Sequence, residues 1–237
     1  MQFNSPLVRG RLLKRYKRFL ADVLLEDGSE VTASCPNTGS MLGLSEPGQM
    51  VWLSHTPKQS RKYPYTWELV EVQKGKTKYL VGINTSLPNR IISDALTEDL
   101  ISPLKGYTSL RREVPYGKSS RIDILLEDPR KGLAYVEIKN VHLIRKRGLA
   151  EFPDSQTERG VKHLNELGDM IKKGHRAVMI YLIQREDARA FSIAKDIDPK
   201  YANALNVARK KGVETLAAVC RVTIESITFS HLLSIPE

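Results

Sequence analysis

Residues 120–139 read SRIDILLEDPRKGLAYVEIK, and this stretch decides the fold of the second half of the chain. An apolar, β-branched run comes first, a turn containing proline and glycine follows, and a second apolar run ends at Lys139. Two such runs on either side of a turn predict a β-hairpin. We therefore expect Asp123 on the first strand to lie near Glu137 and Lys139 on the second.

The second strand of this hairpin carries the candidate chemistry. Side chains alternate along a strand, so Glu137 and Lys139 share one face, while Ile138 turns to the core and offers only its backbone carbonyl. Hard divalent ions such as Mg²⁺ or Mn²⁺ take oxygen ligands, often one or two carboxylates with waters and substrate phosphate. The expected metal ligands are Asp123, Glu137 and the Ile138 carbonyl, with Lys139 beside the attacking water. A cross-strand ion pair such as Asp123 with Lys139 is the alternative.

The pattern of Asp123 followed by Glu137-x-Lys139 on adjacent strands resembles the active-site signature of the PD-(D/E)XK nuclease-like fold. The resemblance implies that the two acids bind metal and that the lysine orients or activates the hydrolytic water.

A narrower resemblance spans nearly the whole chain. An ordered set of motifs is similar to those of the sugar fermentation stimulation protein A family: RFLADV at 18–23, CPNTGSM at 35–41, RID at 121–123, EIKNV at 137–141, FPD at 152–154, TERG at 157–160 and KHL at 162–164. Ser34 departs from the pattern, since the family would have histidine there. The resemblance implies a bacterial DNA-binding protein linked to regulation of maltose metabolism, with a small barrel domain ahead of a nuclease-like domain.

Composition agrees with a folded, basic protein. The chain has 237 residues, 41% of them hydrophobic, and a formal net charge of +10. A positive charge of this size favours a polyanionic partner, first of all nucleic acid, although a merely basic protein remains the alternative. Cys35 and Cys220 form no motif for zinc or for a disulfide framework. The chain begins without a signal pattern and has no apolar run of about 20 residues, so we expect a soluble, cytoplasmic protein without a membrane partner.

The first half of the chain predicts a small barrel. Short strands are expected over residues 7–13, 19–25, 30–34, 49–54, 65–72 and 78–83, with no long helix between them. A closed OB-like β-barrel over residues 1–87 fits this pattern, because closure removes exposed strand edges.

The second half, residues 88–237, predicts a nuclease-like α/β domain. Asn89 is expected to cap a helix over residues 90–101. Strands are expected over 108–114, 121–127, 133–139, 177–183, 189–193 and 216–223, and helices over 157–173 and 198–212. Residues 141–154 are interpreted as a loop or broken element. A helix-turn-helix over residues 198–223 is a weaker alternative.

Basic residues in three places are candidates for nucleic-acid binding. In the helix over 157–173, Arg159 and His163 share a face with Lys162 beside them, suited to a scissile phosphate or, alternatively, forming a solvated face. The other candidates are Arg145, Lys146 and Arg147 in the loop before that helix, and Arg9, Arg11, Lys14, Arg15, Lys17 and Arg18 in the barrel. The basic residues of the loop bind nucleic acid or, alternatively, are simply solvated. The basic residues of the barrel alternate with aromatic residues, so they suit the binding of single-stranded nucleic acid or, alternatively, protect an edge strand from aggregation.

Three functional hypotheses follow. The first is a DNA-binding protein with little sequence preference that acts in gene regulation. The second is a Mg²⁺- or Mn²⁺-dependent nuclease, in which Lys139 positions water and Arg159 steadies the developing charge. The third, with least support, is a sugar- or nucleotide-binding regulator that uses Asn37, Thr38 and Ser40 of the barrel loop, residues that alternatively only cap the backbone.

Overall fold

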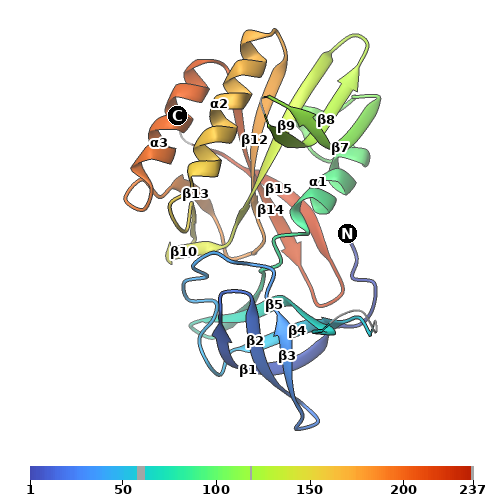
Figure 1. Cartoon of the computed structure of the whole chain (residues 1–237), viewed down its shortest axis with the longest axis vertical. Coiled ribbons are helices and arrows are strands. Elements are labelled where there is room, and N and C mark those ends of the chain that lie inside the picture. Colours follow the sequence, from blue (N-terminus) through green and yellow to red (C-terminus); the bar gives the residue numbers. More distant parts are fainter. Residues whose placement is uncertain (58–61, 118, 236–237) are drawn as a thin grey trace.

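The computed structural model describes residues 1–57, 62–117 and 119–235, and it has a β-barrel at one end and an α/β part at the other (Figure 1). The barrel strands are β1 (Val8–Tyr16), β2 (Leu20–Leu25), β3 (Glu30–Ser34), β4 (Met50–His55), β5 (Tyr65–Lys74) and β6 (Thr77–Gly82). They pair in the order β3-β2-β1-β4-β5-β6. A parallel pairing of β3 with β5 closes the first five strands, as an OB-like barrel requires.

The barrel encloses its own apolar core. Leu12, Val23, Leu53 and Trp67 are fully buried there, each on a different strand. The first strand extends to Tyr16, beyond the predicted residues 7–13, with a register shift between Leu12 and Lys14. Several of the basic residues predicted to bind nucleic acid therefore lie on β1.

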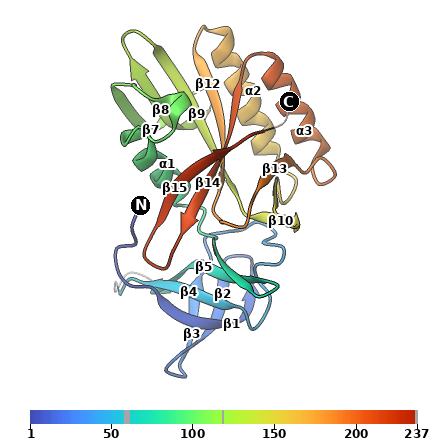
Figure 2. The ribbon, with the colours of Figure 1, turned by 180° about the vertical axis from the view of Figure 1, so that it is seen from behind.

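The α/β part is built on one mixed sheet. Its elements are α1 (Pro88–Thr97), the short 3-10 helix η1 (Ser102–Leu104), β7 (Ser109–Tyr116), β8 (Ser120–Asp128), β9 (Gly132–Val141), β10 (Leu143–Lys146), β11 (Leu149–Phe152), α2 (Glu158–Lys172), β12 (Arg176–Ile183), β13 (Ala190–Ile193), α3 (Pro199–Lys210), β14 (Glu214–Val222) and β15 (Ile227–Leu233). The main sheet has the order β15-β14-β12-β9-β8-β7, and a small sheet has the order β10-β11-β13. Helices α2 and α3 cover one face of the main sheet and α1 the other (Figures 1 and 2).

Helices α2 and α3 begin at side-chain caps that are linked to each other. The Thr157 hydroxyl accepts the Gly160 N–H, and Asp198 accepts the Tyr201 N–H. The same Asp198 carboxylate accepts the Thr157 N–H at 2.8 Å. One acid thus satisfies backbone donors at both helix starts, which fixes the entry of α2 over the sheet.

Three sequence predictions need correction, and one strand was not predicted. Asn89 does not cap α1, because the helix begins at Pro88 with Leu87 at the N-cap position, and it ends at Thr97 rather than at residue 101. Residues 141–154, interpreted as a loop or broken element, contain the short strands of the β10–β11 hairpin, so the loop interpretation is wrong. The helix-turn-helix alternative is wrong, because β14 follows α3. The strand β15, which pairs antiparallel with β14, was not predicted.

The two parts are joined by specific contacts. The Ser40 N–H and hydroxyl both donate to Asp154, and the Gly82 N–H donates to the Gln184 carbonyl. The first residues of the chain contact the α/β part, where the Met1 ammonium lies 3.2 Å from Asp94. Division of the chain at residue 87 stays a prediction. No helix within the described residues is long and apolar enough to span a membrane.

Candidate active site

The site forms where β8 and β9 separate. Antiparallel pairing runs from the turn to Ile124 opposite Val136 and is not continued beyond that pair. One residue further along β8, the side chain of Asp123 replaces a backbone carbonyl as the hydrogen-bond acceptor for β9, since its Oδ2 accepts the Ile138 N–H at 2.7 Å. A side chain thus replaces a strand partner, and the opening leaves room for polar groups between the two strands.

Glu137 is the centre of a buried polar cluster. Its side chain is 2% exposed, and its Oε1 accepts a hydrogen bond from Lys139 Nζ at 2.6 Å. His163 Nδ1 contacts the same oxygen from α2. Glu137 Oε2 is buried and has no hydrogen-bond partner among the described residues. Lys139 therefore pairs with the acid on its own strand, and the alternative of a cross-strand pair with Asp123 is not what the structure shows.

The two acids have pKa values displaced in opposite directions. Burial, followed by the negative charge of Glu137, raises the pKa of Asp123 to about 6, against the hydrogen bonds from Ile138 and Asn89. Burial alone would raise the pKa of Glu137 too, but the hydrogen bond from His163 and the charge of Lys139 outweigh it and lower that pKa. Glu137 is therefore ionised at neutral pH, while the pKa of Asp123 lies closer to neutral pH.

Asn89 and Glu113 belong to this site, and the sequence did not reveal them. Asn89 Nδ2, from the first turn of α1, donates to Asp123 Oδ1 at 3.0 Å and to Glu113 Oε1 at 2.6 Å. Glu113 on β7 has φ of 55°, a left-handed conformation that is rare outside glycine. A polar residue at the start of a helix is the only local signal for Asn89, and that signal predicts a cap. Glu113 gave no local signal.

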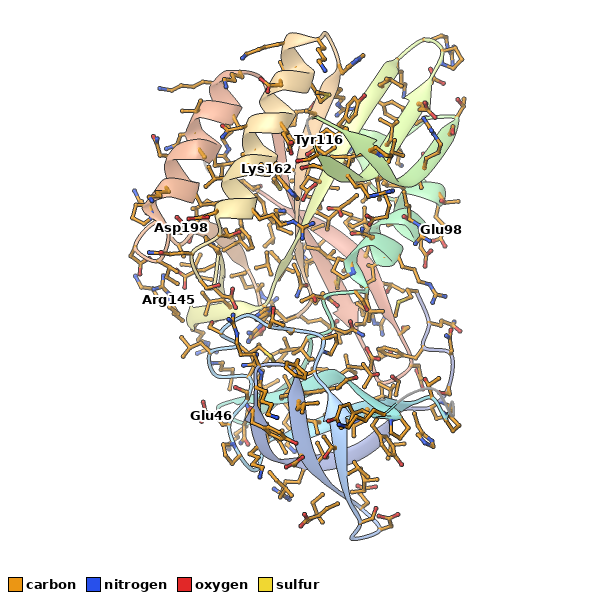
Figure 3. The ribbon with its side chains drawn as sticks, in the orientation of Figure 1. Glu46, Glu98, Tyr116, Arg145, Lys162 and Asp198 are labelled. Atoms are coloured by element: carbon orange, nitrogen blue, oxygen red, sulfur yellow. The ribbon has the colours of Figure 1, made fainter. Side chains whose placement is uncertain are left out.

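The predicted basic face of α2 divides into two roles. Arg159 Nε donates to His163 Nε2 at 3.3 Å, which confirms that these residues share a face. His163 is buried against Glu137, so it lies inside the cluster, away from the surface on which it was predicted to bind nucleic acid. Lys162 instead donates to Ser119 Oγ at 2.9 Å, facing the turn after β7 (Figure 3).

Several charges predicted to bind nucleic acid are engaged within the barrel. Arg15 donates to the carbonyls of Asn37 and Gly39, and Arg18 donates to the Thr38 carbonyl. These bonds hold the loop over residues 35–41, in which Asn37 Oδ1 also accepts the Gly39 N–H. The remaining engaged members of the cluster are Arg9 with Glu26, Arg11 with the Gly48 carbonyl and Lys14 with Asp22. Lys17 is exposed.

The basic residues predicted on β10 and in the turn after it also differ in whether their charges are paired. Arg145 pairs with Glu151 and Asp196, so its guanidinium is engaged by two carboxylates at the surface of the α/β part (Figure 3). Lys146 and Arg147 are exposed, and no hydrogen bond or ion pair joins their side chains to another described residue. Within this stretch, Lys146 and Arg147 therefore leave their charges available to a ligand, and Arg145 does not.

The donor atoms of this site suit a divalent metal ion that keeps part of its shell for water and phosphate. In the residues that the structure describes, no group of three or more His, Cys, Asp or Glu side chains is arranged to hold a metal. The protein would therefore supply two carboxylates and the Ile138 carbonyl, leaving other positions to water and phosphate, as magnesium sites often do. Glu137 Oε2, which is buried and has no partner among the described residues, and the nearby Asp123 carboxylate are oxygen atoms of the kind that such an ion takes as ligands.

Comparison with known proteins gives matches over the whole chain. The model described as "Sugar fermentation stimulation protein RE domain" matches residues 86–226, and "SfsA N-terminal OB domain" matches residues 13–83. Sugar fermentation stimulation protein homologs of Brucella anthropi and Rhodospirillum centenum are each 55% identical to this chain. The matches cover 99% and 98% of this chain and 100% and 98% of those proteins. A solved structure of Pyrococcus furiosus SfsA in complex with Ca²⁺ is 28% identical, with a TM-score of 0.87, over 100% of this chain and 98% of that one.

Proposed function

Because the chain belongs to the sugar fermentation stimulation protein family, as its motifs predicted, we propose that it is a cytoplasmic DNA-binding protein with little sequence preference that helps to regulate maltose metabolism. The observation that supports DNA binding is the net charge of +10, part of it on exposed side chains such as Lys17, Lys146 and Arg147. Such charges displace counterions from phosphates without reading bases.

A binding measurement tests this proposal. Labelled duplex and single-stranded DNA of several unrelated sequences are titrated with the protein at a series of salt concentrations. We expect dissociation constants that agree within about threefold between sequences and weaken steeply with salt, because phosphate contacts dominate. Absence of binding at low salt would contradict the proposal, and so would one sequence bound more than about a thousandfold tighter than the rest, the scale of specific recognition.

A second candidate function, hydrolysis of phosphodiester bonds of DNA or RNA, is supported by the convergence of Asp123, Glu137 and Lys139. The related Pyrococcus furiosus protein was solved in complex with Ca²⁺, and the residues that would hold a divalent ion in this chain are Asp123, Glu137 and the Ile138 carbonyl. Bound Mg²⁺ or Mn²⁺ would polarise the phosphate and lower the pKa of a water molecule.

The side chains around the acids have distinct tasks in this reaction. Lys139, held by Glu137 and 3.2 Å from His163 Nδ1, would position the attacking water with its ammonium group. Arg159, fixed through His163, would offer a planar cationic fork to the phosphate as negative charge develops. Asn89 and the Ile138 N–H would orient the Asp123 carboxylate.

A cleavage assay tests the second candidate. Labelled single-stranded, duplex and branched DNA and RNA are incubated with Mg²⁺ or Mn²⁺ and with the wild type, Asp123→Ala or Lys139→Ala. We expect cleavage by the wild type, its loss in both variants and retained binding, because the substitutions remove chemistry and leave the surface charges. Asp169→Ala, an exposed acid on α2, serves as the control. Tight binding without cleavage of any substrate would leave a DNA-binding protein on a nuclease-like scaffold.

A further inference from the structure

A groove lies between the barrel and the α/β part, where the β5–β6 hairpin meets the turn between β10 and β11. It encloses about 430 Å³. Lys74, Thr77 and Tyr79 line it from the barrel, and Arg147 and Arg189 line it from the other side. Figures 1 and 2 show that β10 lies at the end of the α/β part that faces the barrel. Two regions far apart in sequence thus supply its positive charges.

These charges are available to a ligand. Lys74 and Arg147 are exposed and make no ion pair with another described residue. Arg189 is exposed too, and its Nη1 donates to the carbonyls of Glu186 and Ala188, which orients the guanidinium without neutralising it. The groove therefore has three uncompensated cations, in contrast to the engaged arginines of β1.

The single carboxylate in the groove wall does not cancel them. Asp187 accepts two hydrogen bonds from Arg185, at 2.6 Å and 2.8 Å. Both side chains are buried, at 8% and 3% exposed. This bidentate pair is neutral as a unit, so the net charge of the lining remains close to three positive charges.

We propose that this groove is the surface that binds the nucleic-acid backbone, bridging the barrel and the α/β part. The inference rests on the proposed DNA-binding function and gives it a location. Lys74 and Arg189 join Arg147 as phosphate contacts. Tyr79, half-buried among the three cations, offers a ring on which a base of a single strand can stack. Arg15 and Arg18 of the barrel cluster then serve mainly to hold the loop over residues 35–41.

The test compares two sets of substitutions that remove the same charge. The groove variant carries Lys74→Gln, Arg147→Gln and Arg189→Gln. The control variant carries Lys105→Gln, Arg130→Gln and Arg221→Gln, which are also one lysine and two arginines, all exposed and outside the groove. Affinity for labelled single-stranded and duplex DNA is measured against salt concentration, and circular dichroism checks that both variants remain folded.

We expect the groove variant to bind roughly 10- to 100-fold more weakly than the wild type, with a salt slope smaller by about two to three, while the control changes much less. A larger loss with single strands than with duplex, together with weaker single-strand binding by Tyr79→Ala, would support stacking. Equal losses in the groove and control variants would overturn the groove as the binding surface but leave DNA binding intact. Failure of the wild type to bind DNA would overturn the proposed function and the groove together.

Discussion

Asp123 makes the folded state sensitive to pH, because its carboxyl is buried beside a second acid. A pKa raised to about 6 means that the folded protein holds this proton more tightly than the unfolded chain does. As pH rises from about 4 to about 6, the unfolded state has already lost the proton and the folded state has not, so stability falls through this window and stays lower above it.

Asp123→Asn should therefore stabilise the metal-free protein, with the larger gain at higher pH. The asparagine can still accept the Ile138 N–H but carries no charge beside Glu137. We expect the free energy of unfolding to rise by about 3 kcal/mol at pH 8 and by roughly half of that at pH 5. Urea denaturation in EDTA measures both values. A gain that does not depend on pH would show that Asp123 titrates at its ordinary pKa.

A bound divalent cation should turn the charges of Asp123 and Glu137 from destabilising into stabilising. Ca²⁺, Mg²⁺ or Mn²⁺ that binds only the folded state raises its stability by about 2.7 kcal/mol at a hundred times the dissociation constant. We expect a concentration-dependent rise of Tm for the wild type and for Glu98→Gln, an exposed acid at the end of α1 (Figure 3). Asp123→Asn and Glu137→Gln should show no such rise. Equal shifts in all four proteins would place the ion elsewhere.

The hairpin residues of the site were predictable from sequence, whereas its supporting residues were not. Asp123, Glu137 and Lys139 lie on two strands joined by a short turn, so alternation alone places them together. Asn89 reaches Asp123 from a position 34 residues earlier, across the packing of α1 on the sheet. No local pattern encodes that contact, and the rule that polar residues cap helices favoured the wrong role.

At the scale of elements, α2 carries two glycines in different surroundings. A Cβ at Gly160 would lie 2.8 Å from Thr157 and 2.9 Å from the Tyr201 ring on α3. A Cβ at Gly168 would meet only the Lys211 side chain, at 3.0 Å, and that side chain is flexible. Close approach of α2 to α3 therefore requires glycine at the first position but not at the second.

Replacing each glycine by alanine should have effects of opposite sign. Alanine favours a helix by about 1 kcal/mol over glycine, so Gly168→Ala should stabilise the protein by up to about that amount. Gly160→Ala should destabilise it by about 1–3 kcal/mol, since overpacking against Tyr201 outweighs the helix preference. Chemical denaturation of the two variants beside the wild type measures this. Stabilisation by both would mean that α2 and α3 separate easily.

Elements with a clear period were predictable, and short elements stabilised by distant partners were not. Helix α2 was placed to within one residue at each end, because its apolar spacing and its Thr157 cap are local. The β10–β11 hairpin was missed because it has only short strands and pairs with β13, some forty residues later. Strand β15 has the sequence ITFSHLL, which is rich in residues that suit strands, so its local signal was present and was missed.

At the scale of the whole molecule, the family motifs predicted an OB-like barrel ahead of an α/β domain, but not how the two are joined. The barrel loop over residues 35–41 contacts Asp154, whose carboxylate accepts bonds from the Ser40 N–H and hydroxyl. His142 Nε2 lies 3.4 Å from the same carboxylate. Burial would raise the pKa of Asp154, but His142 and Ser40 outweigh it and hold that pKa well below its usual range. Ser40 and Asp154 are 114 residues apart, so only the folded chain reveals this contact between the two parts.

Asp154→Ala should uncouple the two parts of the molecule. The change leaves the Ser40 donors and His142 without their acceptor, a loss of about 1–3 kcal/mol where the two parts meet, while the apolar clusters are not altered. We expect the single calorimetric transition of the wild type to broaden or divide into two, and cleavage by protease between residues 83 and 88 to become faster. Asp169→Ala removes the same charge from an exposed position and should preserve one transition. A sharp single transition in Asp154→Ala would show that the remaining contacts suffice, namely the apolar packing of Trp52 and Leu69 against the α/β part and the Gly82 and Met1 contacts, because cooperative unfolding requires that the parts lose their structure together.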